Sequence, residues 1–282
     1  MKISNNSVQY SASDLVNFLG CNHLNNLDRR AAIGEIELPE WNNPSLKLLQ
    51  KKGEEHEGAY ISHLKTKGLS VCELDGQSAE ATQEALKKGY DIITQARLKT
   101  GNWVGIADVL VKVDGESDLG NYHYEIEDTK LAKETKAGTV VQLCLYAELL
   151  ADQQGVTPSK MRVVKPGDDF PKEEFQYAEF EAYFRLIKGQ YQAVMDQEIQ
   201  ASKPYPVPKC DTCRWWKNCN QQWHDEDHLS LVANIRSNQV KELETQGIQT
   251  LESYANEPKP FREKPEQGNE ATYEKVHNQA KI

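Results

Sequence analysis

Hydrophobic residues recur with helical spacing in five segments of the chain and follow strand-like patterns in five others. A repeat near 3.6 residues predicts a helix, and a repeat of two predicts a strand. The helices are predicted over residues 11–20, 45–66, 78–88, 136–153 and 177–201. The strands are predicted over residues 68–74, 91–98, 102–113, 122–130 and 161–164. This order of elements predicts an α/β protein whose mixed central sheet is flanked by helices.

Residue types at the ends of these segments agree with the assignment. Ser11 or Ser13 can cap the first helix, and Gly20 ends it directly before Cys21. Thr100-Gly101-Asn102 lies between two extended runs, which is typical of a β-hairpin.

The chain after Cys219 is predicted to be helical to about residue 256. Leu243-x3-Gly247-Ile248-x-Thr250-Leu251 resembles the turn of a helix–hairpin–helix motif that binds the DNA backbone. A plain pair of helices closing at Gly247 is the simpler interpretation, because glycine commonly ends helices. From residue 257 the sequence is polar and Pro-rich. We therefore predict a main domain over 1–228, a small helical pair over 229–256, and a polar linker or the start of a further region over 257–282.

Carboxylates on two neighbouring predicted strands are the first candidates for chemistry. Asp128 and Lys130 are two residues apart, so their side chains leave the same face of a strand. Glu125 and Glu127 must then face the other way, toward a helix or solvent. Asp108 lies among apolar neighbours on the preceding strand, where a lone charge is costly unless it is paired or bound to metal. A structural salt bridge or a strand-end turn would also explain Asp108.

Polar residues on two predicted helices complete the candidate set. His56 could add an imidazole ligand, although a lone helical histidine is more often a surface or core residue. Gln142 and Tyr146 are four residues apart and share one helix face. Four short motifs thus follow one another: Gly53-x2-His56, Gly105-x2-Asp108, Asp128-x-Lys130 and Gln142-x3-Tyr146.

In order and spacing these motifs resemble the RecB-like PD-(D/E)xK nucleases, a family often joined to a superfamily-one helicase. The resemblance covers roughly residues 10 to 255 and implies a restriction-endonuclease-like fold with metal-dependent hydrolysis of DNA. It implies that Mg²⁺ or Mn²⁺ binds His56, Asp108, Asp128 and the carbonyl of Thr129. The acid of the third motif is an aspartate rather than a glutamate, and the family accepts both.

The same resemblance assigns roles to three further residues. Lys130 would orient or activate water and steady the charged phosphorus centre. Gln142 and Tyr146 would support the site or touch DNA.

Six cysteines in a chain predicted to be cytoplasmic are not expected to form disulfides. Cys210-x2-Cys213-x5-Cys219 offers three thiolates, and a metal centre with four ligands needs one more. Cys21 is the best candidate because it directly follows a glycine that ends a helix. Cys72 and Cys144 lie in apolar periodic segments and are predicted to be core residues.

An early cysteine with a late C-x2-C-x5-C also resembles the iron–sulfur nucleases of CRISPR adaptation and of flap-processing helicase-nucleases. This implies a 4Fe-4S cluster in a helical subdomain that joins the N-terminal and C-terminal parts. Zinc is the alternative, with His224 or His228 as fourth ligand. Trp215 and Trp216 would shield the centre or offer a stacking surface to bases, and shielding is favoured.

The formal net charge of −10 is unfavourable for a protein that binds nucleic acid, because phosphate contacts supply most non-specific affinity. Cations do gather in two places, and we expect a basic groove along Lys130, Lys133 and Lys136 and along the segment Lys209–Lys217. Other cations near the second group are Lys203 and Arg214.

No run of about 18 apolar residues is present, and residues 1–6 lack the apolar core of a secretory signal. The sequence therefore predicts a cytoplasmic protein without a membrane span. It predicts a metal-dependent deoxyribonuclease acting on single-stranded DNA or DNA ends, with a helicase domain as possible partner in the same or a longer chain. Two alternatives stay open: a non-catalytic DNA-binding or helicase-accessory domain, and a zinc-stabilised interaction domain.

Overall fold

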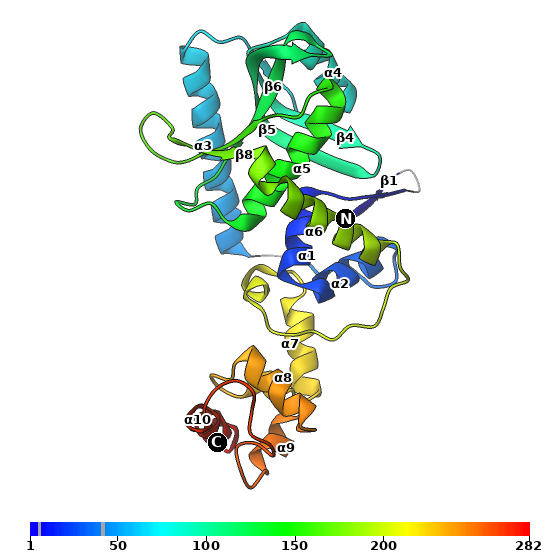
Figure 1. Ribbon diagram of the computed structural model, residues 1–282, viewed down its shortest axis with the longest axis vertical. Helices are drawn as coiled ribbons and strands as arrows, with labels where there is room; N and C mark the ends of the chain where they lie inside the picture. The colour runs from blue at the N-terminus through cyan, green and yellow to red at the C-terminus, as the bar shows by residue number, and fades with distance from the viewer. Residues whose placement is uncertain (5–6, 41–42) are drawn as a thin grey trace. The chain divides into compact units, whose positions relative to one another are not determined.

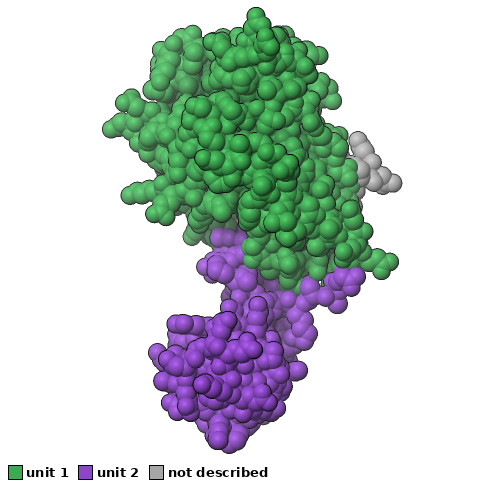
Figure 2. Space-filling view, in the orientation of Figure 1, with its two compact units in different colours: residues 1–199 green, residues 200–282 purple. Residues whose placement is uncertain are grey.

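A computed structural model gives the fold of residues 1–4, 7–40 and 43–282. The chain divides into two units, Met1–Ile199 and Gln200–Ile282, which Figure 2 colours separately. The sequence placed this boundary at 228. The difference arises because Tyr205 packs against the hydrophobic cluster of the C-terminal helices and its hydroxyl donates to the carbonyl of Ser237 at 3.0 Å. The Pro-rich segment before Cys210 therefore belongs to the second unit.

The centre of unit 1 is a six-stranded mixed sheet of order β3-β4-β5-β6-β7-β8 (Figure 1). The pairs β3–β4 and β6–β7 are parallel and the other three pairs are antiparallel. The strands are β3 Val71–Glu73, β4 Ile92–Thr100, β5 Trp103–Ser117, β6 Gly120–Thr129, β7 Lys160–Val164 and β8 Lys172–Gln176. The five predicted strands are present. The edge strand β8 was not predicted, because Lys172-Glu-Glu-Phe-Gln176 lacks apolar alternation.

Helices cover both faces of this sheet, and each face has its own hydrophobic cluster. The helices are α1 Ala12–Gly20, α2 Asn22–Ala32, α3 Pro44–Thr66, α4 Ala79–Lys88, α5 Ala137–Gln154 and α6 Tyr177–Met195. The larger cluster lies beneath α5, which contributes Leu143, Ala147 and Leu150. The smaller cluster joins Tyr60 and Leu64 of α3 to the opposite face. A separate hairpin pairs β1 Lys2–Ser4 with β2 Ser7–Gln9.

Five of these helices match the predicted segments, whereas α2 and the β1–β2 hairpin were not predicted. Helix α2 has the sequence Asn22-His-Leu-Asn-Asn-Leu-Asp-Arg-Arg-Ala-Ala32, which carries few apolar residues to reveal a helical period. Within the described residues, none of the helices combines the length and the apolar content that crossing a bilayer demands.

Strands β4 and β5 share an irregularity halfway along their ladder. Thr94 pairs with Val109 and Ala96 with Ala107 in one unchanged register, but Gln95 and Asp108 between them do not pair, and Gln95 has φ +50°. The alternation of side chains is reversed at this point. Ala107 and Leu110 are three positions apart, yet both side chains enter the cluster beneath α5, whereas in a regular strand they would lie on opposite faces. An irregularity of this kind re-aims the side chain at its centre.

Unit 2 is a small helical body with its own core. Its elements are η1 Pro208–Thr212, α7 Trp216–Asp225, η2 Leu229–Leu231, α8 Ser237–Thr245, α9 Leu251–Ala255 and α10 Glu270–Ala280. Gly247 has φ +77° between α8 and α9, a conformation that favours glycine. The segment 257–282 was predicted to be a polar linker or the start of a further region. Instead Tyr273, Val276 and Ala280 of α10 are buried in the core, because they lie three, four and seven residues apart on one face.

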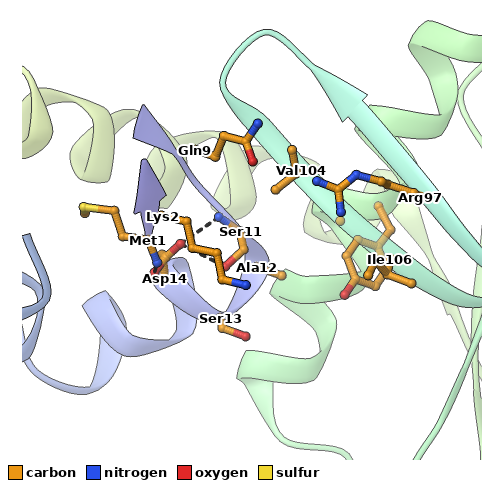
Figure 3. Close-up of a pocket in the computed structure, with 12 residues that line it drawn as sticks. Met1, Lys2, Gln9, Ser11, Ala12, Ser13, Asp14, Arg97, Val104 and Ile106 are labelled. Atoms are coloured by element: carbon orange, nitrogen blue, oxygen red, sulfur yellow. Dashed lines mark hydrogen bonds and ion pairs between the residues drawn. The ribbon is translucent and has the colours of Figure 1, made fainter. Parts of the chain in front are cut away.

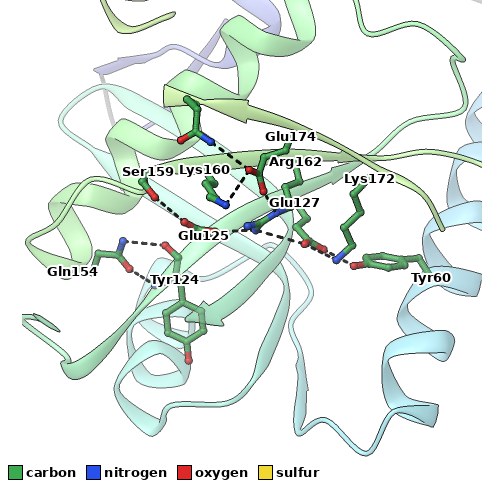
Figure 4. Close-up of polar contacts among 11 residues, drawn as sticks. Tyr60, Tyr124, Glu125, Glu127, Gln154, Ser159, Lys160, Arg162, Lys172 and Glu174 are labelled. Atoms are coloured by element: carbon green, nitrogen blue, oxygen red, sulfur yellow. Dashed lines mark hydrogen bonds and ion pairs between the residues drawn. The ribbon is translucent and has the colours of Figure 1, made fainter. Parts of the chain in front are cut away.

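The α3 side of β6 carries a buried ionic network (Figure 4). Glu125 and Glu127 face this side, as the alternation of β6 predicted. Arg162 Nη1 lies 2.8 Å from Glu125 Oε2, and Lys172 Nζ lies 2.6 Å from Glu127 Oε1. The hydroxyl of Tyr60 on α3 donates to Glu127 Oε2. Each buried carboxylate therefore has a cation of its own, as buried charges require.

We expect Arg162→Ala to lower the free energy of unfolding by about 3 kcal/mol, because it leaves the buried Glu125 carboxylate without its cation. Denaturant unfolding measures the effect. Arg185→Ala is the matched control, since Arg185 pairs with Glu181 on the surface of α6, and its loss should change stability by less than about 0.5 kcal/mol. Equal stabilities of the two variants would contradict the role given to the network.

Candidate active site

Asp128 is the second-to-last residue of β6 and is completely buried. Its Oδ2 forms an ion pair with Nζ of Lys130, which confirms that the two side chains share a face. Its Oδ1 accepts a hydrogen bond from Gln142 Nε2 on α5 at 3.2 Å. The carboxylate thus lies on the α5 side of the sheet, opposite to Glu125 and Glu127.

The irregularity in β5 places the Asp108 side chain next to Asp128. The β5–β6 ladder begins with Val109 opposite Glu127, so Asp108 is the next residue and stands beside Asp128 at its open end. Asp108 Oδ2 accepts the backbone N–H of Thr129 at 2.9 Å and its hydroxyl at 3.1 Å. Two carboxylates and the backbone of Thr129 therefore meet at one point. Asp108 is not a strand-end residue, and within the described residues it makes no salt bridge.

Gln142 and Tyr146 lie on one face of α5, as their spacing predicted. Gln142 Nε2 also donates to the hydroxyl of Tyr146 at 3.0 Å, which extends the chain of contacts from Asp128. Tyr146 lies flat against Gly105 of β5, where an added Cβ would come within 2.5 Å of Tyr146 Cε1. The glycine of the Gly105-x2-Asp108 motif is explained by this close approach.

His56 on α3 reaches the same strand end from the opposite face of the sheet. Its Nε2 lies 3.2 Å from the carbonyl of Val164, which also accepts the backbone N–H of Lys130 at 3.0 Å. Because a carbonyl only accepts, this contact needs the proton on Nε2 and leaves a lone pair on Nδ1. The ring also stacks on Phe170, with centroids 5.7 Å apart.

Burial and the neighbouring Asp108 raise the pKa of Asp128 to about 7, although Lys130 opposes the shift. Two carboxylates this close repel one another, and a cation between them would remove the repulsion. Carboxylate and carbonyl oxygens are the ligands that Mg²⁺ and Mn²⁺ prefer, so the donor set fits such an ion. Within the described part of the chain, no three side chains of His, Cys, Asp and Glu are grouped closely enough to hold a metal by themselves.

Two residues at this site were not singled out from the sequence. Glu57 follows His56 and is half-buried, and burial together with the nearby Asp108 raises its pKa. Gln95 Nε2 donates to Glu57 Oε1 at 2.5 Å from the irregular position in β4. The sequence did not identify Glu57, because it is one of several acidic residues on α3. It did not identify Gln95, because no sequence pattern distinguishes this residue from its neighbours.

Cys21 caps α2 in unit 1, where its Sγ accepts the N–H of Leu24 at 3.4 Å. The other three proposed ligands are in unit 2. Cys210 lies in η1, and its Sγ accepts the N–H of Val207 at 3.5 Å, while Cys213 ends η1 and Cys219 lies in α7.

The remaining cysteines and the tryptophans differ in exposure. Cys144 is a buried core residue, and burial raises the pKa of its thiol to about 12, while Cys72 packs against the same cluster. Trp215 is buried, whereas Trp216 is 40% exposed. His228, an alternative zinc ligand, accepts the N–H of Ser230 through Nδ1 at 3.1 Å.

No protein-family model matches the chain, and no curated protein matches it either. A solved structure described as the crystal structure of SSO0001 is 14% identical, with a TM-score of 0.40. The match covers 77% of this chain and 88% of that one. A likeness at this level carries no argument about activity.

The electrostatics of Asp128 predict how stability depends on pH. Because its pKa is raised by burial and by Asp108, folded Asp128 should keep its proton to a higher pH than an unfolded aspartate, which loses it near 4. The contribution of Asp128 to the free energy of unfolding therefore falls as the pH rises from about 4 to about 7. In metal-free buffer we expect Asp128→Asn to be more stable than the parent at pH 8, by up to a few kcal/mol, and to lose this advantage at pH 5.

Thermal and denaturant unfolding at both pH values measure this difference. Asp114→Asn on the exposed end of β5 is the control, and it should leave the stability unchanged at both pH values. An advantage of Asp128→Asn that is the same at pH 5 and pH 8 would refute the raised pKa.

Proposed function

We propose that this protein is a metal-dependent deoxyribonuclease of the RecB-like PD-(D/E)xK type, with a restriction-endonuclease-like unit 1. The observation that carries the proposal is the buried Asp128 carboxylate, set beside Asp108 at the open end of the β5–β6 ladder and paired with Lys130. A protein gains nothing in stability from two adjacent carboxylates, one fully buried, so their retention favours a function.

Each residue of the site has a task in phosphodiester hydrolysis. Asp108, Asp128 and the carbonyl of Thr129 would hold Mg²⁺ or Mn²⁺, with His56 completing the set. The bound ion would polarise the phosphodiester and neutralise charge developing on it. Lys130 has a partly exposed side chain, so its ammonium is able to reach from Asp128 to a substrate phosphate or an attacking water.

Gln142 and Tyr146 act through the carboxylate rather than on the bond that breaks. The Gln142 amide donates to Asp128 Oδ1 and fixes the orientation of the carboxylate, and Tyr146 is held in turn by Gln142. This leaves Oδ2 directed at Lys130. Support of this kind orients ligands and tunes their basicity.

The substrate we propose is DNA, as single strands or ends, in repair, recombination or defence. Lys133 and Lys136 are exposed between β6 and α5, beside the proposed site, and would contact the backbone. The net charge of −10 does not prevent this, because repulsion from distant acids is screened over roughly 8 Å at physiological salt. A helicase domain in the same or a longer chain would supply the single strands.

We further propose that Cys21, Cys210, Cys213 and Cys219 hold a 4Fe-4S cluster with a structural role. The N–H groups that donate to the sulfurs of Cys21 and Cys210 support this, because such bonds stabilise thiolate ligands. Zinc remains the alternative, although His228 already uses Nδ1 for Ser230.

The competing proposal is a DNA-binding or helicase-accessory domain that keeps the fold without cleaving. The intact contact chain from Lys130 through Asp128 to Tyr146 favours the enzyme. Cleavage itself decides between the two.

We expect the protein to degrade labelled single-stranded DNA with Mg²⁺ or Mn²⁺ and to stop when a chelator is added. Asp128→Ala and Lys130→Ala should each abolish turnover, because one removes a ligand and the other the cation beside it. Lys130→Ala should still bind Mn²⁺, which calorimetry measures. Arg185→Ala is the control, since Arg185 is exposed on α6, where it pairs with Glu181, and its loss should leave turnover within a few-fold of the parent. Undiminished cleavage by purified Asp128→Ala would sink the assignment.

For the cysteines, we expect anaerobically purified protein to be brown and to contain iron and sulfide. Substitution of Cys21, Cys210, Cys213 or Cys219 by serine should remove the iron and destabilise the protein, because metal binding is coupled to folding. Cys72→Ser is the matched control and should keep the iron. Stoichiometric zinc without iron in protein kept from air would establish the alternative metal.

A further inference from the structure

A cavity of about 310 Å³ opens in unit 1 between the start of α1 and the strands β4 and β5. Ser11 and Ser13 line it from α1, and Arg97 lines it from β4, while Lys2 enters from β1 (Figure 3). Its volume is at the lower end for small-ligand sites. The cavity shares Tyr146 and Gly105 with the candidate active site, and its other lining residues have no role in that site.

The cavity is positively charged. Lys2 and Arg97 approach it from opposite sides (Figure 3), and within the described residues neither forms an ion pair. Arg97 donates only a long hydrogen bond of 3.4 Å, to the carbonyl of Gly76. The carboxylate in the lining, Asp14, is already engaged by the Met1 ammonium and by the N–H and hydroxyl of Ser11. Two cations are therefore available to an anion in the cavity.

One wall of the cavity is apolar and leads to the candidate active site. Val104 and Ile106 of β5 form a wall, and Tyr146 closes the cavity from α5. The hydroxyl of Tyr146 is bonded to Gln142, which is bonded to Asp128. Gly105 in this wall is three residues before Asp108, or about 10 Å along the strand.

We propose that this cavity binds one unpaired nucleotide of the DNA strand, next to the nucleotide whose phosphate is cleaved. Lys2 and Arg97 hold its phosphate, and Val104 and Ile106 contact its sugar or base. The inference rests on the proposed nuclease function and deepens it, because it assigns the residues that hold one nucleotide of the substrate. A base held against this wall has left its partner strand, so the strand must be single or frayed at this point.

Two cations on one phosphate give strong, charge-assisted hydrogen bonds, and arginine suits the planar geometry of two phosphate oxygens. An apolar wall accepts any base, so binding should depend little on sequence. In this arrangement the cavity binds the strand, and hydrolysis takes place at Asp128.

The test measures binding of a fluorescein-labelled oligothymidylate by anisotropy in EDTA, where no cleavage occurs. We expect Arg97→Ala to weaken binding about tenfold and to reduce the salt slope by about 0.7, the value for one phosphate contact on a single strand. Arg97→Lys should recover part of the loss. Ser13→Glu, which adds a negative charge at the exposed start of α1, should weaken binding without altering Arg97.

Lys99→Ala is the matched control, because Lys99 lies two residues beyond Arg97 on the same face of β4, is exposed and does not line the cavity. It should bind within twofold of the parent. Equal affinities of Arg97→Ala and Lys99→Ala for the oligothymidylate would overturn the proposal. So would binding of a blunt duplex by the parent as tightly as it binds the single strand.

Parallel assays with Mg²⁺ separate this inference from the proposed function. Cleavage by the parent together with unaffected binding by Arg97→Ala means that the cavity is not the subsite while the nuclease stands. Loss of binding in Arg97→Ala without any cleavage by the parent supports the nucleotide site and removes the nuclease.

Discussion

The Asp128 carboxylate lies in the protein interior and is held there by the Lys130 ammonium and the Gln142 amide. Burial and the neighbouring Asp108 raise its pKa, so the ionised form is costly until a cation offsets the charge. Gln142 connects this carboxylate to Tyr146, which in turn packs against Gly105 of β5. The divalent cation that we propose would supply this charge.

The carboxylates on the two sides of β6 differ in the cations that neutralise them. On the α3 side, Glu125 has Arg162 and Glu127 has Lys172, so the charges cancel within the fold. On the α5 side, Asp128 and Asp108 share one end of the ladder, with Lys130 as the nearby cation. The first arrangement stabilises the protein, whereas the second keeps negative charge available for a ligand.

Close approach between α5 and the sheet links the candidate site to the cavity beside it. Glycine at position 105 lets the Tyr146 ring rest on β5, and the same ring forms one wall of the cavity. A side chain at 105 would displace Tyr146 and, through Gln142, disturb Asp128. The shape of the cavity and the orientation of the Asp128 carboxylate therefore depend on the same contact.

The sequence by itself determined five of the six strands of the central sheet and five of the six helices of unit 1, because the repeats of two and 3.6 residues are local properties of elements such as β5, β6 and α5. It also placed Asp128 with Lys130 and Gln142 with Tyr146, since each pair lies within one element of known periodicity. Only the tertiary structure decided that Glu57 and Gln95 join the site, and that α10 belongs to the core of unit 2. Their positions depend on contacts between distant segments, and on a strand irregularity at Gln95 that no local pattern encodes.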